Sequence, residues 1–533
     1  MPNPATSTKK QNWRFARLSS LRAAPHSFLH HPEPRAIGSS IRGEALLAHR
    51  FVFAGHRVEA PDSSIWNIRP PSAAFLVSLQ NFGWLDDLAA IGDKAARKRA
   101  QLWLLEWIEA FGQKNGMGWH PALAGRRVIN WCAHAMFLLK GLTPKQSNAV
   151  FKSLGRHVNF LSNNWKKTPE GLGKIEALAG MVYAGLSLEG CEYALRPALK
   201  GLASACSGWI DADGAIPSRN PEELAGVFVL LTWIAKLLAD NGHPVDSALA
   251  AAMARMAPGL RALQLGDGNL GRFHGGGRGE AGLLDQALSD AEIRGASVNS
   301  FMGYERLASG RITALVDAAA PPDTLAAHHA PLAFELTVGR WPMLSNCGPG
   351  QTRGAGWAEA CATGAAHNTL TIEGQSAAPA PVSLERAHDL QSVWLSAISH
   401  GFAQSFNLLH ERRLLMATNG RQFTGEDRLF PLNPPAEDTA PWAALFRPAR
   451  GHGFMLHFHL HPDVKAEKEA GAVLLTLPNR EGWAFMQEGG LLCLEPSLYL
   501  DRTYTEPRPT KQIVVAGRTL EYVSAIRWSF TRL

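Results

Sequence analysis

The chain is 533 residues long, with 46% hydrophobic and 19% charged residues. This composition excludes collagen-like, coiled-coil and intrinsically disordered chains, and the length exceeds what one hydrophobic core supports, so we expect more than one domain. The formal net charge of +7 suits an acidic partner, such as a polyuronate or a nucleic acid, but a solvated basic surface would give the same value. The six cysteines form no CxxC pair and no zinc-ligand spacing, which favours buried free thiols.

The N-terminal part of the sequence predicts neither a targeting signal nor a membrane span. Residues 1–10 are polar and basic, and no apolar core of a signal peptide follows them. No stretch elsewhere is long and apolar enough to cross a bilayer. We therefore expect a cytoplasmic protein, with an irregular segment over residues 1–62.

Residues 63–296 carry the periodicity of amphipathic helices. Within 101–111, for example, Leu102, Leu105 and Ile108 fall on one helical face. Gly- or Pro-containing breaks separate most of the predicted helices, which are 101–111, 126–140, 174–186, 221–238, 247–257 and 280–288. Many helices of similar length are what an (α/α) toroid, an incomplete helical barrel, requires, although an irregular helical domain would look the same.

From residue 297 to residue 533 the pattern shortens to strands. Apolar side chains recur at every second position of 454–460, which is the period of a strand. Similar runs occur at 333–338, 369–373, 393–398, 473–477, 483–487, 512–515 and 522–530. Helices followed by strands predict a multidomain α+β protein, in which a helical domain precedes an antiparallel β-sandwich.

Several short motifs occur in a set order along the chain. The helical half contains NFGWLDDL at 81–88 and WHPALAGRRVINW at 119–131, and the second half contains GYERLASGR at 303–311, HHAPLAFEL at 328–336, SNCG at 345–348, AHNTL at 366–370 and GEDR at 425–428. Together they resemble bacterial heparinase II/III-like proteins, from about residue 64 to the C-terminus. The resemblance implies a toroid followed by a sandwich, and a polysaccharide lyase that cleaves a uronic-acid-containing glycan by β-elimination between the two domains.

β-Elimination requires three kinds of group. A donor from Asn, Arg or His neutralises the uronate carboxylate, beside which the C5 proton is weakly acidic. A Tyr or His removes that proton, and a Tyr or His protonates the departing O4. In the family, an Asn or His and a Tyr come from the toroid, and a further His comes from the start of the sandwich.

The resemblance assigns the sandwich histidine to His328, with His329 as an adjacent rival. The toroid positions differ from the family, because Leu172 and Gly173 replace its Asn and His and Glu223 replaces its Tyr. A carboxylate at that position would repel a uronate. Three interpretations therefore stay open: a lyase with a rearranged site, a glycoside hydrolase in which Glu223 works with Asp213 or Glu176 as the second carboxylate, or a glycan-binding protein that has lost catalysis.

Further candidates come from the motifs and from residue chemistry. Tyr304 lies near the domain junction and is the best remaining Tyr for acid–base work, against a buried structural role. An Arg on an inner toroid helix could hold a carboxylate with two hydrogen bonds, and a Trp could stack on a sugar face. The candidate substrate-binding residues are Trp119, His120, Arg127, His274, Arg278 and His367. Ion pairing, core packing and plain turns are the structural alternatives for these residues.

We expect no cofactor and no catalytic metal. His457, His459 and His461 share one face of a predicted strand, and such a row could bind a structural divalent metal in the sandwich, but the wet face of a half-buried strand is the commoner explanation. The expected partner is an acidic oligo- or polysaccharide. Nucleic acid is not expected, because the basic residues are dispersed. The oligomeric state stays open, and the family resemblance leaves a periplasmic location open as well.

Overall fold

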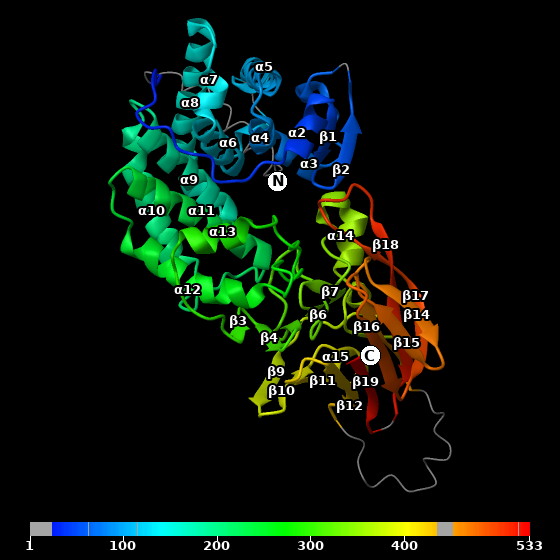
Figure 1. Ribbon diagram of the computed structural model, residues 1–533. Helices are drawn as coiled ribbons and strands as arrows, with labels where there is room; N and C mark the ends of the chain where they lie inside the picture. Colours follow the sequence, from blue (N-terminus) through cyan, green and yellow to red (C-terminus); the bar gives the residue numbers. More distant parts are fainter. Residues whose placement is uncertain (1–23, 62, 114–115, 434–450, 521) are drawn as a thin grey trace, which may run out of the picture. The chain divides into compact units, whose positions relative to one another are not determined.

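The computed structural model describes residues 24–61, 63–113, 116–433, 451–520 and 522–533 (Figure 1). The chain divides into two compact units. The helical unit comprises residues up to 216, 223–257 and 282–294, and the sheet unit comprises 217–222, 258–281 and 295–533. The main boundary therefore lies two residues before the predicted one. Two segments that we assigned to the helical domain, 217–222 and 258–281, belong to the sheet unit.

The N-terminal part of the chain is mostly helical, as the periodicity predicted. Its helices are α2 (Ser40–Leu47), α3 (Ala73–Gln80), α4 (Trp84–Ile91), α5 (Lys94–Phe111), α6 (Pro121–Ala133), α7 (Ala135–Leu139), α8 (Pro144–Asn164), α9 (Leu172–Ser187), α10 (Leu195–Gly208), α11 (Pro221–Asp240), α12 (Ser247–Leu263) and α13 (Leu283–Asp290). The single helix predicted over 126–140 is divided at His134. Residues 40–59, expected to be irregular, instead form α2 and a hairpin of β1 (Arg50–Phe53) and β2 (His56–Glu59).

Glycines and caps explain how the helices begin and pack. Thr143 and Gln146 form a reciprocal capping box at the start of α8, where Pro144 occupies the first turn. α6 crosses α9 at Gly125 and Gly180, and a Cβ atom on Gly180 would lie 2.6 Å from the Gly125 Cα. Only glycines allow this approach of two helix backbones, so the pair fixes where these two helices cross.

The described residues of the sheet unit form three antiparallel sheets, most of whose strands are labelled in Figure 1. The eight-stranded sheet has the order β14-β15-β16-β19-β12-β11-β10-β9, the four-stranded sheet β17-β18-β13-β8 and the five-stranded sheet β3-β4-β5-β6-β7. The strands are β3 (Ser300–Phe301), β4 (Tyr304–Ser309), β5 (Ile312–Asp317), β6 (Phe334–Val338), β7 (Trp341–Leu344), β8 (Leu370–Ile372), β9 (Val382–His388), β10 (Ser392–Ser399), β11 (Leu408–Ala417), β12 (Gln422–Pro431), β13 (Gly453–His459), β14 (Lys465–Glu469), β15 (Ala472–Thr476), β16 (Gly482–Glu488), β17 (Leu491–Tyr499), β18 (Arg508–Arg518) and β19 (Ser524–Arg532), with the short helices α14 (Ala355–Cys361) and α15 (Ala403–Phe406) between them.

One continuous hydrophobic core joins the three sheets. It takes inward-facing side chains from all three, and the rings of Phe334 on β6 and Trp528 on β19 stack at 5.8 Å between centroids. Every predicted strand is found, with its ends shifted by a few residues. The predicted order, a helical domain followed by an antiparallel β domain, is confirmed.

The prediction of a wet histidine face on β13 is wrong. His457 and His459 are 6% and 2% exposed, because the chain covers this face of the four-stranded sheet. His459 Nε2 donates to the Ala365 carbonyl oxygen at 2.9 Å, and its Nδ1 accepts from the Ser497 hydroxyl at 2.7 Å. Both ring nitrogens are therefore occupied, which leaves His459 no lone pair for a metal.

A buried ion pair crosses the centre of the eight-stranded sheet. Arg412 Nε on β11 donates to Asp427 Oδ1 on β12 at 2.8 Å, and both side chains are at most 1% exposed. Asp427 also accepts from His410 Nε2 at 2.6 Å and from Trp528 Nε1 at 2.8 Å. Burial raises the pKa of Asp427, but Arg412 and His410 outweigh it and bring the pKa to about 2. Asp427 is therefore ionised at neutral pH.

We expect Asp427→Ala to lower the free energy of unfolding by about 3–5 kcal/mol, because it leaves the Arg412 guanidinium buried without its counter-charge. Glu426→Ala is the matched control, since the neighbouring carboxylate lies on the opposite, partly exposed face of β12 and should cost no more than about 1 kcal/mol. Urea unfolding of both variants measures the difference. Equal losses in the two variants would contradict a central role for the buried pair.

Candidate functional site

Four residues predicted from the sequence lie together in the sheet unit. The rings of His274 and His328 stack, with their centroids 4.0 Å apart and their planes 8° from parallel. The ring centroid of His367 lies 4.3 Å from that of His328. Tyr304 lies at the start of β4, and its ring centroid is 6.3 Å from that of His274. We call these residues, with Asp317 and Arg219, the histidine cluster.

Asp317 and Arg219 supply the charges of this cluster, and sequence reasoning missed both. Asp317 ends β5, and its Oδ2 lies 3.3 Å from His274 Nε2 and 3.6 Å from His328 Nε2. Arg219 forms an ion pair with Asp317 Oδ1 and donates to the carbonyl oxygens of Met302 at 2.9 Å and Ala320 at 2.6 Å. The sequence could have indicated Asp317, because it is a single carboxylate at the end of an otherwise apolar strand. No sequence pattern singles out Arg219.

Two residues of the cluster hold strained backbone conformations. Arg219 has a φ of +52° and His274 a φ of +48°, in the left-handed region that residues other than glycine disfavour. The guanidinium contacts of Arg219 compensate at the first position, and its ring contact with Tyr304, at 4.9 Å, adds to them. The cluster is thus a specifically held arrangement.

Burial shifts the pKa values of Tyr304, His328 and His367 away from neutral pH. Tyr304 is 1% exposed, and its hydroxyl donates to the Arg219 carbonyl oxygen at 2.6 Å. Burial, and then the charge of Asp317, raise the pKa of Tyr304 well above 10. Burial lowers the pKa of His328 well below 6.5 and that of His367 to about 4. Groups with such pKa values are poor bases and poor acids near neutral pH.

The cluster is also closed to a large substrate within the described residues. His328 is 3% exposed, and neither of its ring nitrogens has a hydrogen-bond partner among the described residues. His274 is 1% and Asp317 is 1% exposed. A glycan chain has no route of contact to these atoms in this conformation.

The donor atoms of His274, Asp317 and His328 lie within 4.8 Å of one another, close enough to suggest a metal. A metal binds imidazole nitrogen in the plane of the ring, at about 2.0–2.1 Å for zinc. The planes of His274 and His328 are only 8° from parallel, with their centroids 4.0 Å apart. One ion cannot lie in both ring planes, so this stacked arrangement does not fit a shared metal.

Two predicted substrate ligands need correction. Arg127 and Trp119 are 0% and 1% exposed inside the helical unit. Arg127 donates to His157 Nε2 at 2.8 Å and to the Gln80 carbonyl oxygen at 2.7 Å, and its guanidinium lies 4.1 Å from the Trp107 ring centroid. These residues pack the helical core, which leaves no aromatic face or guanidinium edge for a sugar.

The remaining predicted residues lie at the surface or in ion pairs. His120 is exposed at the start of α6. Glu223, on α11, accepts from the Leu172 backbone N–H at 3.4 Å, at the start of α9. In the sheet unit, Arg278 pairs with Asp501 at 3.0 Å. Their assignments as site residues stay predictions.

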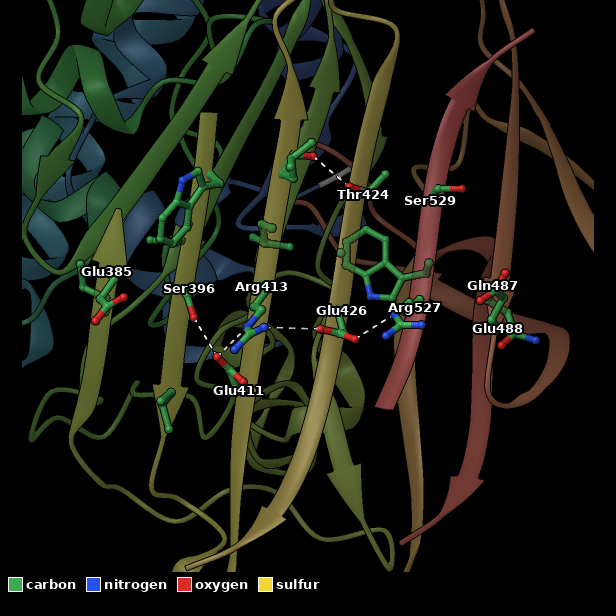
Figure 2. Close-up of a pocket in the computed structure, with 18 of the residues that line it drawn as sticks. Glu385, Ser396, Glu411, Arg413, Thr424, Glu426, Gln487, Glu488, Arg527 and Ser529 are labelled. Carbon is green, nitrogen blue, oxygen red and sulfur yellow. Dashed lines mark hydrogen bonds and ion pairs between the residues drawn. The ribbon is translucent and has the colours of Figure 1, made fainter. Parts of the chain in front are cut away.

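A groove on the outer face of the eight-stranded sheet is the second feature of the sheet unit that sequence reasoning missed (Figure 2). Its volume is about 980 Å³. Charged side chains from β9 to β16 line it, together with Trp394, Leu415 and Met486. No sequence signal pointed to it, because its residues come from six strands that only the sheet topology places side by side.

Comparison with known proteins places this architecture. The family model for the heparinase II/III-like C-terminal domain matches residues 296–529. FtsZ-localized protein C of Caulobacter vibrioides (strain NA1000 / CB15N) is 29% identical over 550 residues, which cover 97% of this chain and 91% of that protein. Among solved structures, heparinase III matches with a TM-score of 0.72 at 13% identity, over 100% of this chain and 92% of that one.

A second solved structure extends the likeness to another lyase. The chondroitin AC lyase of Streptomyces coelicolor A3 matches with a TM-score of 0.51 at 11% identity, over 99% of this chain and 83% of that one. The likenesses show the fold, a helical toroid followed by a β-sandwich, as predicted. Among the described residues, none of the helices has the length and hydropathy needed to cross a membrane.

The buried histidines predict how stability depends on pH. His367 has a folded pKa of about 4, below its ordinary value of about 6.5, so the unfolded chain binds more protons between these values. Stability is complete above pH 6.5 and falls as the pH approaches 4. At pH 5 this one histidine should cost about 2 kcal/mol relative to pH 7.

Urea unfolding at pH 7 and pH 5 tests this prediction. His367→Gln should lose about 2 kcal/mol less than the unchanged protein between the two pH values, because the titrating group is gone. His243→Gln is the control, because His243 is exposed on the helical unit and its replacement should leave the pH dependence unchanged. An unaltered pH dependence in His367→Gln would contradict the assigned cause.

Proposed function

We propose that this chain, a member of the heparinase II/III family through its C-terminal domain, is a binding protein on a lyase fold, without elimination activity, that acts where FtsZ is localised. The observation that carries this proposal is the burial of the candidate acid–base groups. Elimination needs a Tyr or His that reaches the C5 proton and the O4 oxygen of the substrate. Tyr304 instead donates to a backbone carbonyl, and His328 lies in the stacked cluster.

The altered toroid positions support the same proposal. Glu223 replaces the Tyr of the family, and its carboxylate accepts from the Leu172 N–H at the N-terminus of α9. A carboxylate at a helix N-terminus is stabilised by the unpaired N–H groups and the helix dipole. This gives Glu223 a structural role. Glu176, a candidate second carboxylate for hydrolysis, is similarly engaged in an ion pair with Arg126 at 2.7 Å.

The site of action rests on the relative that spans nearly the whole chain. FtsZ-localized protein C matches over 97% of this chain, which covers both the helical and the sheet unit. We propose that this chain shares the localisation that the relative's name describes. An acidic glycan stays a candidate ligand of the chain, whose net charge is +7.

An active lyase is the second candidate, and the fold favours it. The TM-score of 0.72 to heparinase III covers the full chain, so the overall frame of such an enzyme is present. In that case elimination would have to proceed through a conformation in which His328 and Tyr304 become accessible.

Incubation with heparan sulfate, chondroitin sulfate and a polyuronate separates the two candidates. Elimination creates an unsaturated uronate that absorbs in the ultraviolet, and we expect no such absorbance, whereas heparinase III as positive control should give it. Size-exclusion analysis of the glycans detects hydrolysis, for which we also expect no change. Ultraviolet product that disappears in His328→Gln and Tyr304→Phe would establish the lyase and overturn the proposal.

Localisation is tested separately. We expect the purified chain to co-sediment with FtsZ polymers, and a fluorescent fusion to overlap with FtsZ in dividing cells. Unpolymerised FtsZ and polymers of an unrelated filament protein are the controls. A chain that stays in the supernatant and distributes evenly in cells would refute the proposed site of action.

A further inference from the structure

The groove in the sheet unit is organised as regular rows across the strands (Figure 2). The strands β9, β10, β11, β12, β19 and β16 each contribute one residue to a line across the sheet. In the antiparallel register, each of these residues lies directly opposite the one on the next strand. This charged row consists of Glu385, Ser396, Arg413, Glu426, Arg527 and Glu488. Residues opposite each other on one face have neighbouring Cβ atoms, so the row forms a continuous line of polar groups.

A second row runs beside the first, two residues along each strand. It consists of Trp394, Leu415, Thr424, Ser529 and Met486. Leu415 is 40% and Met486 is 58% exposed. The apolar members of this row, Trp394, Leu415 and Met486, place hydrophobic area at the surface next to the charged row. Hydrophobic area beside charged groups is typical of protein interaction sites.

The arginines at the centre of the charged row form ion pairs, whereas the glutamates at its two ends form none among the described residues. Arg413 pairs with Glu411 at 2.8 Å, and Arg527 pairs with Glu426 at 2.9 Å. Glu385 and Glu488, at opposite ends, are exposed, and among the described residues no ion pair reaches either of them. The groove lining contains four glutamates against two arginines, and Arg428 on the same face of β12 pairs with Glu411 at 2.9 Å, so the excess negative charge lies at Glu385 and Glu488.

This charge pattern selects among possible occupants. An acidic glycan would meet the excess of carboxylates. A second copy related by a two-fold axis through the centre of the row would place Glu385 against Glu488, and like charges that face each other are destabilising. A cationic partner would instead pair with both open ends.

We propose that this face docks a segment of another protein that carries Lys or Arg on each side of a short apolar stretch. The basic groups would pair with Glu385 and Glu488, and the apolar stretch would cover Leu415 and Met486. Five strand spacings separate β9 from β16, which is about 24 Å at roughly 4.8 Å per spacing. An extended segment spans this distance in about seven residues. The proposal does not depend on the function proposed above.

Fluorescence anisotropy with a designed peptide tests the proposal. The probe is fluorescein-labelled Lys-Lys-Ala-Leu-Phe-Ala-Ala-Lys-Lys, and the control peptide replaces its four lysines by glutamates. We expect saturable binding of the first peptide, weakened by salt because exposed charges are screened, and at least tenfold weaker binding of the second. Equal binding of both peptides, or binding of neither, would overturn the proposal.

Variants of the chain locate the binding. The double variant Glu385→Lys with Glu488→Lys should bind the basic peptide at least tenfold more weakly, and Leu415→Ala with Met486→Ala should weaken the part of the binding that salt does not remove. Glu467→Lys is the matched control, since Glu467 is an exposed glutamate of β14 outside the groove. Thermal unfolding checks that each variant is folded.

Two outcomes would contradict the assignment. If Glu467→Lys weakens binding as much as the double variant does, the peptide senses overall charge and not this face. If sedimentation shows a dimer that Leu415→Ala with Met486→Ala dissociates, the face is covered by a second copy.

Discussion

The buried Arg412–Asp427 pair is the constraint on which much of the sheet unit depends. Arg412 Nη1 donates to the carbonyl oxygens of Leu332 and Asn368, each at 2.7 Å. Leu332 follows the loop that carries His328, and Asn368 directly follows His367. One guanidinium therefore holds both loops against β11, and it can stay buried only while Asp427 balances its charge. The positions of two histidines of the cluster are thus consequences of a charge pair that neither of them contacts.

That arrangement explains why histidines in lyase-like motifs need not form a reactive site. Asp317 is held by Arg219, and burial lowers the pKa of His328 well below its ordinary value, so this imidazole is neutral near pH 7. The neutral ring of His328 offers a flat aromatic surface, on which the ring of His274 stacks at 4.0 Å between centroids. The buried rings of the histidine cluster therefore contribute to the packing of the sheet unit. The toroid-side change at Glu223 is consistent with this, since its carboxylate closes a helix start.

The sequence predicted the elements well and the environments poorly. Periodicity located the helices and strands because each period is a local property. It could not tell that α6 turns Arg127 inward, or that chain from elsewhere covers His457 and His459, because burial depends on distant segments. Arg219 and Asp317 are 98 residues apart, and the groove joins six strands whose order differs from their order in the chain. Only the assembled topology brings such residues together.

The side chains on the outer face of the eight-stranded sheet are not explained by the stability of the fold. Exposed ion pairs such as Arg527–Glu426 contribute at most about 1 kcal/mol each, so folding gives little reason to align them in a row. Exposed Leu415 and Met486 lower solubility, and no ion pair among the described residues balances the charges of Glu385 and Glu488. Residues that contribute little to folding, yet form two regular rows across six strands, fit the partner segment that we propose for this face.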